Sequence, residues 1–390
     1  MRVNGQSFRT IWQADAGGDV AVIDQTLLPF AFEVRTLRHV EDAATAIRDM
    51  VVRGAPLIGV TAAYGVALAL REHPGDDSLA AAIEKLVATR PTAVNLRWAA
   101  ERMRRAVATL PPPEQAARAY AEAAAIAEED VASCAAIGRH GLSLLRDLAH
   151  DQGRERISVL THCNAGWLAC VDWGTALAPV YAAHEAGLPV HVYVDETRPR
   201  SQGAFLTAFE LGAHGVPYTV ITDNAGGHLL QQGEVDVCLV GSDRTTASGD
   251  VANKIGTYLK ALAARDNGVP FYAALPFSTI DWSLTDGIAG IPIEERSPRE
   301  VTHVTGRTTD GRLAEVEVAA PGSPAAPRSG PRWRGRIGSW RIAVGRGPRS
   351  RRPARRRASS ALHQGLWKSG GLWCSMKPSG RCSGRGGVTR

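Results

Sequence analysis

The chain has 390 residues, of which 44% are hydrophobic, and it contains six cysteines. This composition indicates a globular protein of about two domains and excludes a chain disordered throughout, a disulfide scaffold and a membrane protein. The longest uncharged apolar run, residues 54–70, is at the short limit for a membrane span and contains Pro56, so it predicts a buried helix. The N-terminus lacks the apolar core of a secretory signal. We therefore expect a cytoplasmic protein with reduced thiols.

The charge is unevenly distributed along the chain. Residues 327–390 hold 15 Arg, 2 Lys and no acidic residue, whereas residues 1–326 hold 28 basic and 39 acidic residues. The overall charge of +6 is thus a −11 body joined to a +17 tail. A basic arm that binds nucleic acid is one interpretation of the tail. We favour coding sequence read in the wrong frame, because the tail holds four of the nine tryptophans and disordered segments are usually poor in aromatic residues.

The first 150 residues predict a small sheet followed by helices. Residues 19–37 alternate apolar and polar positions, as an antiparallel sheet would. From Val40 the apolar positions recur with a helical period. The expected helices are Glu41–Val52, Pro56–Leu70, Leu79–Ala88, Asn95–Thr109 and Glu114–His150.

Between Glu155 and Ile280 the pattern becomes strand, loop and helix, repeated. The strand runs are ISVLTHCN, VHVYVDETRP, YTVITDN, VDVCLVGSDR and PFYAALPFSTI. Continuous β-branched runs separated by helices predict an α/β fold with a parallel sheet, in which ligands bind beyond the C-terminal ends of the strands. The polar residues at those ends are Cys163, Asp195, Asp223, Asp243 and Ser278.

Several basic residues lie where they could bind phosphate. Arg53 precedes a helix start with free backbone N–H groups, although an exposed arginine in a turn between helices is the favoured interpretation of that tripeptide alone. Arg90 is either a second phosphate ligand or a loop charge. Asn253 and Lys254 follow a loop of small residues, which suits either anion binding or simple capping. No P-loop and no GxGxxG after a strand is present, so nucleotide binding has no support.

Cys163 and Asp243 are the candidates for acid and base chemistry. Cys163 ends a strand before small residues at an expected helix start, where the helix dipole would favour a thiolate. Alternation along the strand points His162 to the opposite face, so we do not pair the two. Asp243 has apolar neighbours, and partial burial would raise its pKa. No Cys/His spacing suits a metal ion, and Cys134, Cys170 and Cys238 are expected to be packing residues.

Seven segments together resemble the methylthioribose-1-phosphate isomerase family. They are DQTLLP (24–29), VVRGAPLIGVTAAYGVALA (51–69), RPTAVNLRWA (90–99), THCNAG (161–166), DETRPRSQGA (195–204), ITDNA (221–225) and GSDRTTASGDVANKIGTY (241–258). The resemblance spans about residues 7–326 in unbroken order. It implies a homodimeric, cofactor-free enzyme of methionine salvage that isomerises 5-methylthioribose 1-phosphate to 5-methylthioribulose 1-phosphate. It also implies a Rossmann-like domain over residues 151–326, after an N-terminal sheet and helical domain over residues 1–150.

The resemblance implies Cys163 and Asp243 as the catalytic pair. It implies substrate-binding roles for Arg53, Gly54, Ala55, Arg90, Gln202, Asn253 and Lys254. An anomeric phosphate prevents the ring from opening to a free aldehyde, so an acid must protonate the ring oxygen. Our hypothesis is that Asp243 is this acid and that Cys163 transfers the C2 proton, with a hydride shift from C2 to C1 as the alternative.

The same fold is shared with isomerases of related sugar phosphates, such as ribose 1,5-bisphosphate or 5-deoxyribose 1-phosphate. It is also shared with the non-catalytic alpha, beta and delta regulatory subunits of the translation-initiation guanine-nucleotide exchange factor. A scaffold would not need Cys163 and Asp243 together. The resemblance stops near Ala326, where the family continues with an NPAFDVTP-type segment that this chain lacks, and we expect a frameshifted or disordered tail over residues 327–390.

Overall fold

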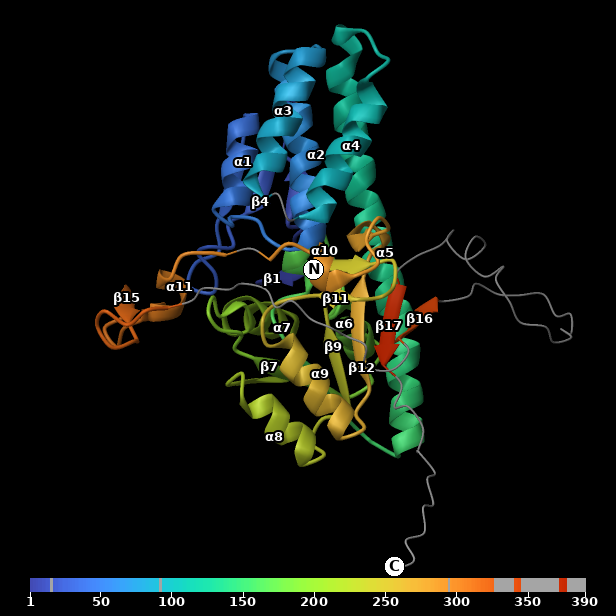
Figure 1. Cartoon of the computed structure of the whole chain (residues 1–390), viewed down its shortest axis with the longest axis vertical. Coiled ribbons are helices and arrows are strands. Elements are labelled where there is room, and N and C mark those ends of the chain that lie inside the picture. The colour runs from blue at the N-terminus through green and yellow to red at the C-terminus, as the bar shows by residue number, and fades with distance from the viewer. Residues whose placement is uncertain (15–16, 91–92, 294, 326–339, 345–371, 377–390) are drawn as a thin grey trace, which may run out of the picture.

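The computed structural model describes residues 1–14, 17–90, 93–293, 295–325, 340–344 and 372–376 (Figure 1). Short antiparallel strands open the chain, as the alternation predicted. They are β1 (Arg2–Val3) paired with β2 (Gln6–Ser7), and β4 (Val20–Ile23) lying between β3 (Ile11–Gln13) and β5 (Val34–Leu37).

Five helices follow, and all five predicted helices are confirmed with their ends shifted by a few residues. They are α1 (Val40–Arg48), α2 (Ala55–Glu72), α3 (Asp76–Thr89), α4 (Val94–Val107) and α5 (Pro112–Gln152). Every residue of 56–70 in α2 is buried, because α1, α3, α4 and α5 pack around it. The apolar run is therefore a core helix. In the described part of the chain, no helix combines the length and apolarity needed to cross a membrane.

The second half of the body is built on a parallel sheet, and all five predicted strands are present. They are β6 (Ile157–Thr161), β7 (Val190–Asp195), β8 (Tyr218–Ile221), β9 (Val237–Val240) and β12 (Phe271–Leu275). Their order in the sheet is β12-β9-β6-β7-β8. The chain moves outward from β6 in one direction and then returns to start β9 on its other side. The crevice at the β6/β9 switch point is where such sheets bind ligands.

Helices connect these strands, as the repeated pattern predicted. They are α6 (Ala178–Glu185), α7 (Ala208–His214), α8 (Ala225–Gln231) and α9 (Thr257–Asp266), with three-to-five-residue helical segments η1 (Trp167–Ala169), η2 (Gly203–Thr207) and η3 (Phe277–Thr279). The long helix α5 packs against α2 at one end and against α6 at the other. It thereby joins the helical layer to the sheet layer (Figure 1).

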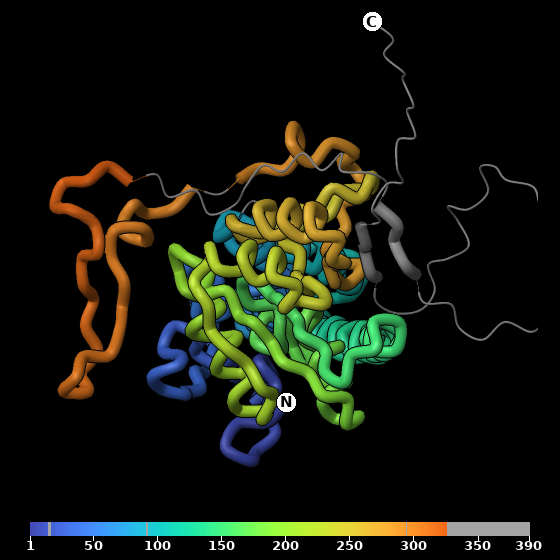
Figure 2. The backbone as a smooth tube through the Cα atoms, turned by 90° about the horizontal axis from the view of Figure 1, so that it is seen from below, coloured from blue at the N-terminus to red at the C-terminus, as the bar shows by residue number. Residues whose placement is uncertain are grey.

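Smaller elements complete the body. A three-stranded sheet contains β10 (Arg244–Thr246), β11 (Val251–Ala252) and β13 (Ile280–Asp281). After α10 (Gly287–Gly290) and α11 (Arg299–Thr302), a hairpin of β14 (His303–Arg307) and β15 (Leu313–Glu317) projects from the body (Figure 2).

Two segments of the basic tail are described as strands. They are β16 (Trp340–Val344) and β17 (Leu372–Met376), and β17 pairs antiparallel with β12. The predicted tail spans residues 327–390, and apart from β16 and β17 its residues lie outside the part of the chain that the structure describes.

Candidate active site

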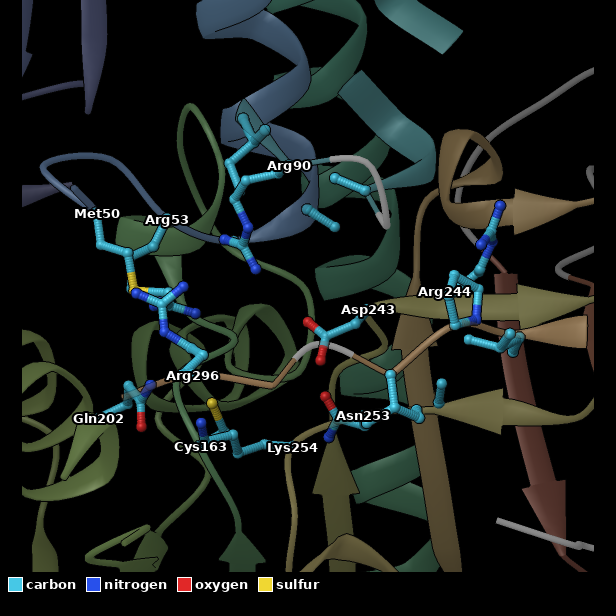
Figure 3. Close-up of a pocket in the computed structure, with 18 residues that line it drawn as sticks. Met50, Arg53, Arg90, Cys163, Gln202, Asp243, Arg244, Asn253, Lys254 and Arg296 are labelled. Atoms are coloured by element: carbon cyan, nitrogen blue, oxygen red, sulfur yellow. The ribbon is translucent and has the colours of Figure 1, made fainter. Parts of the chain in front are cut away.

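One cavity at the switch point brings together all nine residues that the family resemblance singled out. Its walls come from α2, the end of α3, and the loops after β6, β7 and β9 (Figure 3). Nine further residues line it: Met50, Ile58, Ala93, Arg244, Ala252, Ile291, Pro292, Ile293 and Arg296. Figure 3 shows Cys163 and Asp243 reaching the cavity from different strands, with the guanidinium group of Arg90 pointing towards the space between them.

The backbone of Cys163 is fixed in an unusual conformation. Its φ angle is 69°, in the left-handed region that costs a non-glycine residue free energy. Two threonine hydroxyls hold it there. The Cys163 N–H donates to Thr197 Oγ1 at 2.8 Å, and Thr207 Oγ1 donates to the Cys163 carbonyl at 2.8 Å. These contacts aim the thiol into the cavity rather than along the sheet.

The surroundings of Cys163 favour the neutral thiol. Burial raises the pKa of Cys163 above its ordinary value, while the cations of Arg53 and Lys254 oppose this rise and Asp243 adds to it. The helix-dipole argument was wrong: η1 begins at Trp167 and has one turn, and α6 begins only at Ala178. Burial likewise lowers the pKa of Lys254, which Cys163 and Asp243 oppose. The cavity is thus a poorly hydrated place for charge.

Asp243 lies between β9 and β10 and is exposed. Its backbone N–H donates to the Ala252 carbonyl at 2.9 Å, which turns the chain back across the mouth of the cavity. The expectation that its apolar strand neighbours would partly bury it was wrong. Those neighbours belong to β9 inside the sheet, whereas Asp243 lies beyond the strand end.

Arg53 is held at the start of α2 by a residue far away in the sequence. Its guanidinium group donates to the side-chain oxygen of Asn164 and, at 2.8 Å, to the backbone carbonyl of Asn164. Gly54 is the N-cap of α2 with φ 93°, and a Cβ there would overlap the backbone of Ala169. The free N–H groups of the helix start therefore face the cavity beside an arginine whose side-chain partner is a neutral amide.

Two amide side chains offer further contacts. Gln202 is 8% exposed and lies at the start of η2, and its Oε1 has no hydrogen-bond partner among the described residues. Asn253 is 7% exposed, and its Nδ2 donates to Thr257 Oγ1 at 3.1 Å. A buried amide oxygen without a partner is costly unless a ligand supplies a donor.

Two arginines of the cavity were missed by the sequence analysis. Arg244 forms an ion pair with Asp281 at 2.7 Å, and Arg296 forms one with Glu300 at 2.8 Å. Asp281 thus pairs with Arg244, whereas Glu300 is shared by Arg296 and Arg200, whose Nη1 lies 2.9 Å from Glu300 Oε1. Arg244 lies within the GSDR motif, but nothing in its sequence context distinguishes it from a loop charge.

Three of the five polar strand-end residues do not line this cavity. Asp195 and Asp223 surround His162 on the other side of β6. Ser278 accepts a hydrogen bond from Asn95 Nδ2 at 2.9 Å and so joins η3 to α4. The expectation that His162 and Cys163 point to opposite faces is confirmed, because both ring nitrogens of His162 have other partners.

The parallel sheet, the crevice at its switch point and the array of basic side chains define an α/β protein with a site for a small anionic ligand. The initiation factor 2 subunit family matches residues 51–325, and the chain belongs to this family. Its curated relatives include methylthioribose-1-phosphate isomerases. That of Methylobacterium nodulans is 68% identical over 326 residues, covering 84% of this chain and 89% of the relative. That of Rhodospirillum rubrum is 61% identical, covering 84% and 85%.

Two solved structures show the same architecture. The 5-methylthioribose 1-phosphate isomerase of Pyrococcus horikoshii OT3 aligns with a TM-score of 0.70 and 40% identity, covering 84% of this chain and 88% of the other. The translation initiation factor eIF-2B, subunit delta, of A. fulgidus aligns with a TM-score of 0.68 and 38% identity, covering 83% and 91%. The mixed α/β fold predicted from the sequence is therefore confirmed.

Proposed function

We propose that this chain isomerises 5-methylthioribose 1-phosphate to 5-methylthioribulose 1-phosphate, an aldose–ketose isomerisation in methionine salvage. The observation that most directly supports this proposal is that Cys163 and Asp243 line one cavity together with seven substrate-binding candidates. The relatives at 61–68% identity carry this activity in their names. A regulatory subunit would have no use for a thiol and a carboxyl group converging on an anion site.

The first step opens the sugar ring. Asp243 gives its proton to the ring oxygen, and the bond between that oxygen and C1 breaks. The Cys163 thiolate takes the proton from C2, and the electron pair of the C2–H bond forms the C1–C2 double bond of an enol. Asp243 is exposed in this structure, so the bound sugar itself would supply the desolvation that favours a protonated carboxyl group.

The second step forms the ketone. The enol hydroxyl at C2 returns its proton to Asp243, the carbonyl forms at C2, and Cys163 delivers its proton to C1. Both residues end in the states in which the first step began, Asp243 protonated and Cys163 as the thiolate that is its minor form, so no cofactor is required. Arg53 and Lys254 favour the thiolate that the first step needs, because both cations oppose the effect of burial on the pKa of Cys163.

Arg53, Arg90 and Lys254 are proposed to bind the phosphate, together with the backbone at Gly54 and Ala55. Arg244 pairs with Asp281, and Arg296 shares Glu300 with Arg200, so we do not assign either to the phosphate. The apolar side chains of Ile58, Ala93, Ile291 and Ile293 also line the cavity, and they fit a methylthio group better than a second phosphate. This favours methylthioribose 1-phosphate over ribose 1,5-bisphosphate.

Substitution of the two catalytic candidates tests the proposal. Cys163→Ser and Asp243→Asn should each lower kcat by at least about 10²-fold. Cys238→Ala, which changes a buried thiol on β9 outside the cavity, and Asp310→Asn, at the exposed tip of the β14–β15 hairpin, are the matched controls. Near-normal turnover in either catalytic variant would refute the assignment.

Isotope transfer tests the route of the hydrogen. In deuterated solvent, the proton route predicts deuterium at C1 of the product. Complete transfer of a deuterium label from C2 to C1 would instead support the hydride shift. This transfer should then show no exchange with solvent at any temperature tested or with substrates that react slowly. Turnover of purified ribose 1,5-bisphosphate and 5-deoxyribose 1-phosphate, measured in parallel, tests the substrate assignment.

We also propose that the chain forms a homodimer through α9. Three exposed apolar side chains of α9 follow one face of the helix at helical spacing, Tyr258, Leu259 and Leu262, and the exposed Ile255 precedes the helix start. A second copy would cover this stripe. In light scattering after size-exclusion chromatography, Leu259→Asp should shift the mass towards a monomer, whereas Val34→Asp, an exposed position on β5, should not. An unchanged mass for Leu259→Asp would refute this interface.

A further inference from the structure

His162 occupies a buried position between two parts of the site. It directly precedes Cys163 at the end of β6 and is 1% exposed. Its Nδ1 lies 2.7 Å from Asp195 Oδ2, and its Nε2 lies 2.6 Å from the backbone carbonyl oxygen of Ile255. The ring thus connects the residue before Cys163 to the residue after Lys254.

Both partners of the His162 ring can only accept hydrogen bonds. A carboxylate oxygen and a backbone carbonyl oxygen carry no hydrogen, so each contact requires an N–H on the ring. A neutral imidazole has one N–H, so one tautomer would place a lone pair 2.6 Å from the Ile255 oxygen and the other would place it 2.7 Å from Asp195 Oδ2, and both contacts are repulsive. The two contacts therefore require a hydrogen on each ring nitrogen, which makes the ring an imidazolium cation.

The groups around His162 balance this charge. Asp195 Oδ2 also lies 3.0 Å from Lys260 Nζ, and Lys260 donates to the backbone carbonyl of Asp223. The Asp223 carboxylate lies 4.0 Å from His162 Nδ1. Two carboxylates, a buried one on Asp195 and a partly exposed one on Asp223, thus face two cations. His162, Asp195 and Asp223 have the spacing of a metal site, but the ammonium group of Lys260 already pairs with the Asp195 carboxylate.

Gly256 allows the loop to lie against the ring. Its φ angle is 103°, and a Cβ at this position would lie 2.6 Å from His162 Cε1 and 2.7 Å from Nε2. Only glycine permits both the conformation and the close approach. The chain that follows Lys254 is therefore built to present the Ile255 carbonyl to the imidazolium.

We infer that His162, as an imidazolium, is a positioning residue that fixes the Asn253–Lys254 loop relative to Cys163. The inference rests on the proposed function for the importance of Cys163 and Lys254, but the charge of the ring is independent of it. Loss of the Nε2 hydrogen would release the Ile255 carbonyl and let Lys254 move away from the thiol. His162 itself touches no cavity space, so it does not transfer a proton in the reaction.

The ring charge can be measured directly in the full-length protein. The chain is labelled with ¹⁵N-histidine, and the His162 signals are identified among the 11 histidines by their loss in His162→Gln. At pH 7.5 we expect two ring ¹⁵N shifts close together, the signature of an imidazolium. Two widely separated shifts, the signature of a neutral tautomer, would overturn the charge assignment whether or not the proposed isomerase activity is correct.

Kinetics test the positioning role. In His162→Gln we expect kcat to fall at least tenfold and KM for methylthioribose 1-phosphate to rise, while His191→Gln, a partly exposed histidine on β7 bonded to Thr219, keeps wild-type values. Gly256→Ala, which pushes the loop off an intact ring, should reproduce both effects if His162→Gln does not fold. A folded His162→Gln or Gly256→Ala protein with wild-type kcat and KM would overturn the inference.

Discussion

Glu210 on α7 should give the stability of this protein a distinctive pH dependence. Its side chain is fully buried behind the active site, where Asn164 Nδ2 donates to Oε1. Burial raises the pKa of Glu210 from 4.5 to about 7, against the lowering effect of its hydrogen bonds, of which that from Asn164 is the strongest. The perturbation we consider is Glu210→Gln, which keeps the shape and the oxygen acceptor but removes the titration.

The size of the effect on the free energy of unfolding follows from the linkage between proton binding and folding. A difference of about 2.5 pKa units corresponds to about 3 kcal/mol. The pKa of this group is higher in the folded protein, so between pH 4.5 and about 7 the native state holds a proton that the unfolded state has lost. This stabilisation is complete below pH 4.5 and is lost as the pH rises through 7. Wild-type protein should therefore lose about 3 kcal/mol relative to Glu210→Gln between pH 4.5 and pH 8.

The assay is urea unfolding of both proteins at several pH values, followed by circular dichroism. Asp130 is buried as well, and burial raises its pKa from 3.8 to about 7, so its contribution has the same sign but is common to both proteins and cancels in the difference. Glu185→Gln, on the exposed side of α6, is the control. A difference between wild type and Glu210→Gln that stays constant from pH 4.5 to pH 8 would refute the reasoning.

Three further predictions concern the site itself. Asn164→Ala removes the side-chain hydrogen bond from Arg53, worth about 1.5–3 kcal/mol, but keeps the one to the backbone carbonyl of residue 164, and it should raise KM for the sugar phosphate roughly tenfold to a hundredfold with a smaller effect on kcat in steady-state assays. Gly54→Ala should abolish measurable turnover and lower the midpoint of thermal unfolding, because its Cβ would overlap Ala169 at φ 93°. Cys163 should react with iodoacetamide faster as the pH rises above 8, since burial raises its pKa, and substrate should slow the reaction; peptide mapping that finds no protection contradicts this.

The sequence predicted the elements of this fold because their signals are local. The apolar period of 56–70 and the β-branched runs such as ISVLT each lie within one element. The orientation of strand-end residues is not local. Cys163 and Asp195 both end strands, yet the left-handed backbone of Cys163 aims its thiol into the cavity while Asp195 turns towards His162.

The substrate-binding candidates depended on the family resemblance for a similar reason. The local tripeptide alone favoured an exposed turn for Arg53. The contact that holds its guanidinium group at the cavity comes from Asn164, more than 100 residues later. No periodicity encodes such a pair. Glu210 offers a weak signal, since a lone carboxyl group within the apolar segment AFLTAFELGA is unusual, but its partner is again distant in the sequence.

Asn164 lies between two buried acidic groups whose pKa values are both raised by burial, the Cys163 thiol in front and the Glu210 carboxyl group behind. Below about pH 7 both groups therefore keep their protons, and Asn164 itself is neutral. The side-chain contact that Asn164 offers to Arg53 consequently leaves the positive charge of the guanidinium group unbalanced. A carboxylate in place of either neutral group would compete with the ligand for this guanidinium. If Arg53 binds the phosphate as proposed, burial around Asn164 preserves its attraction for that dianion.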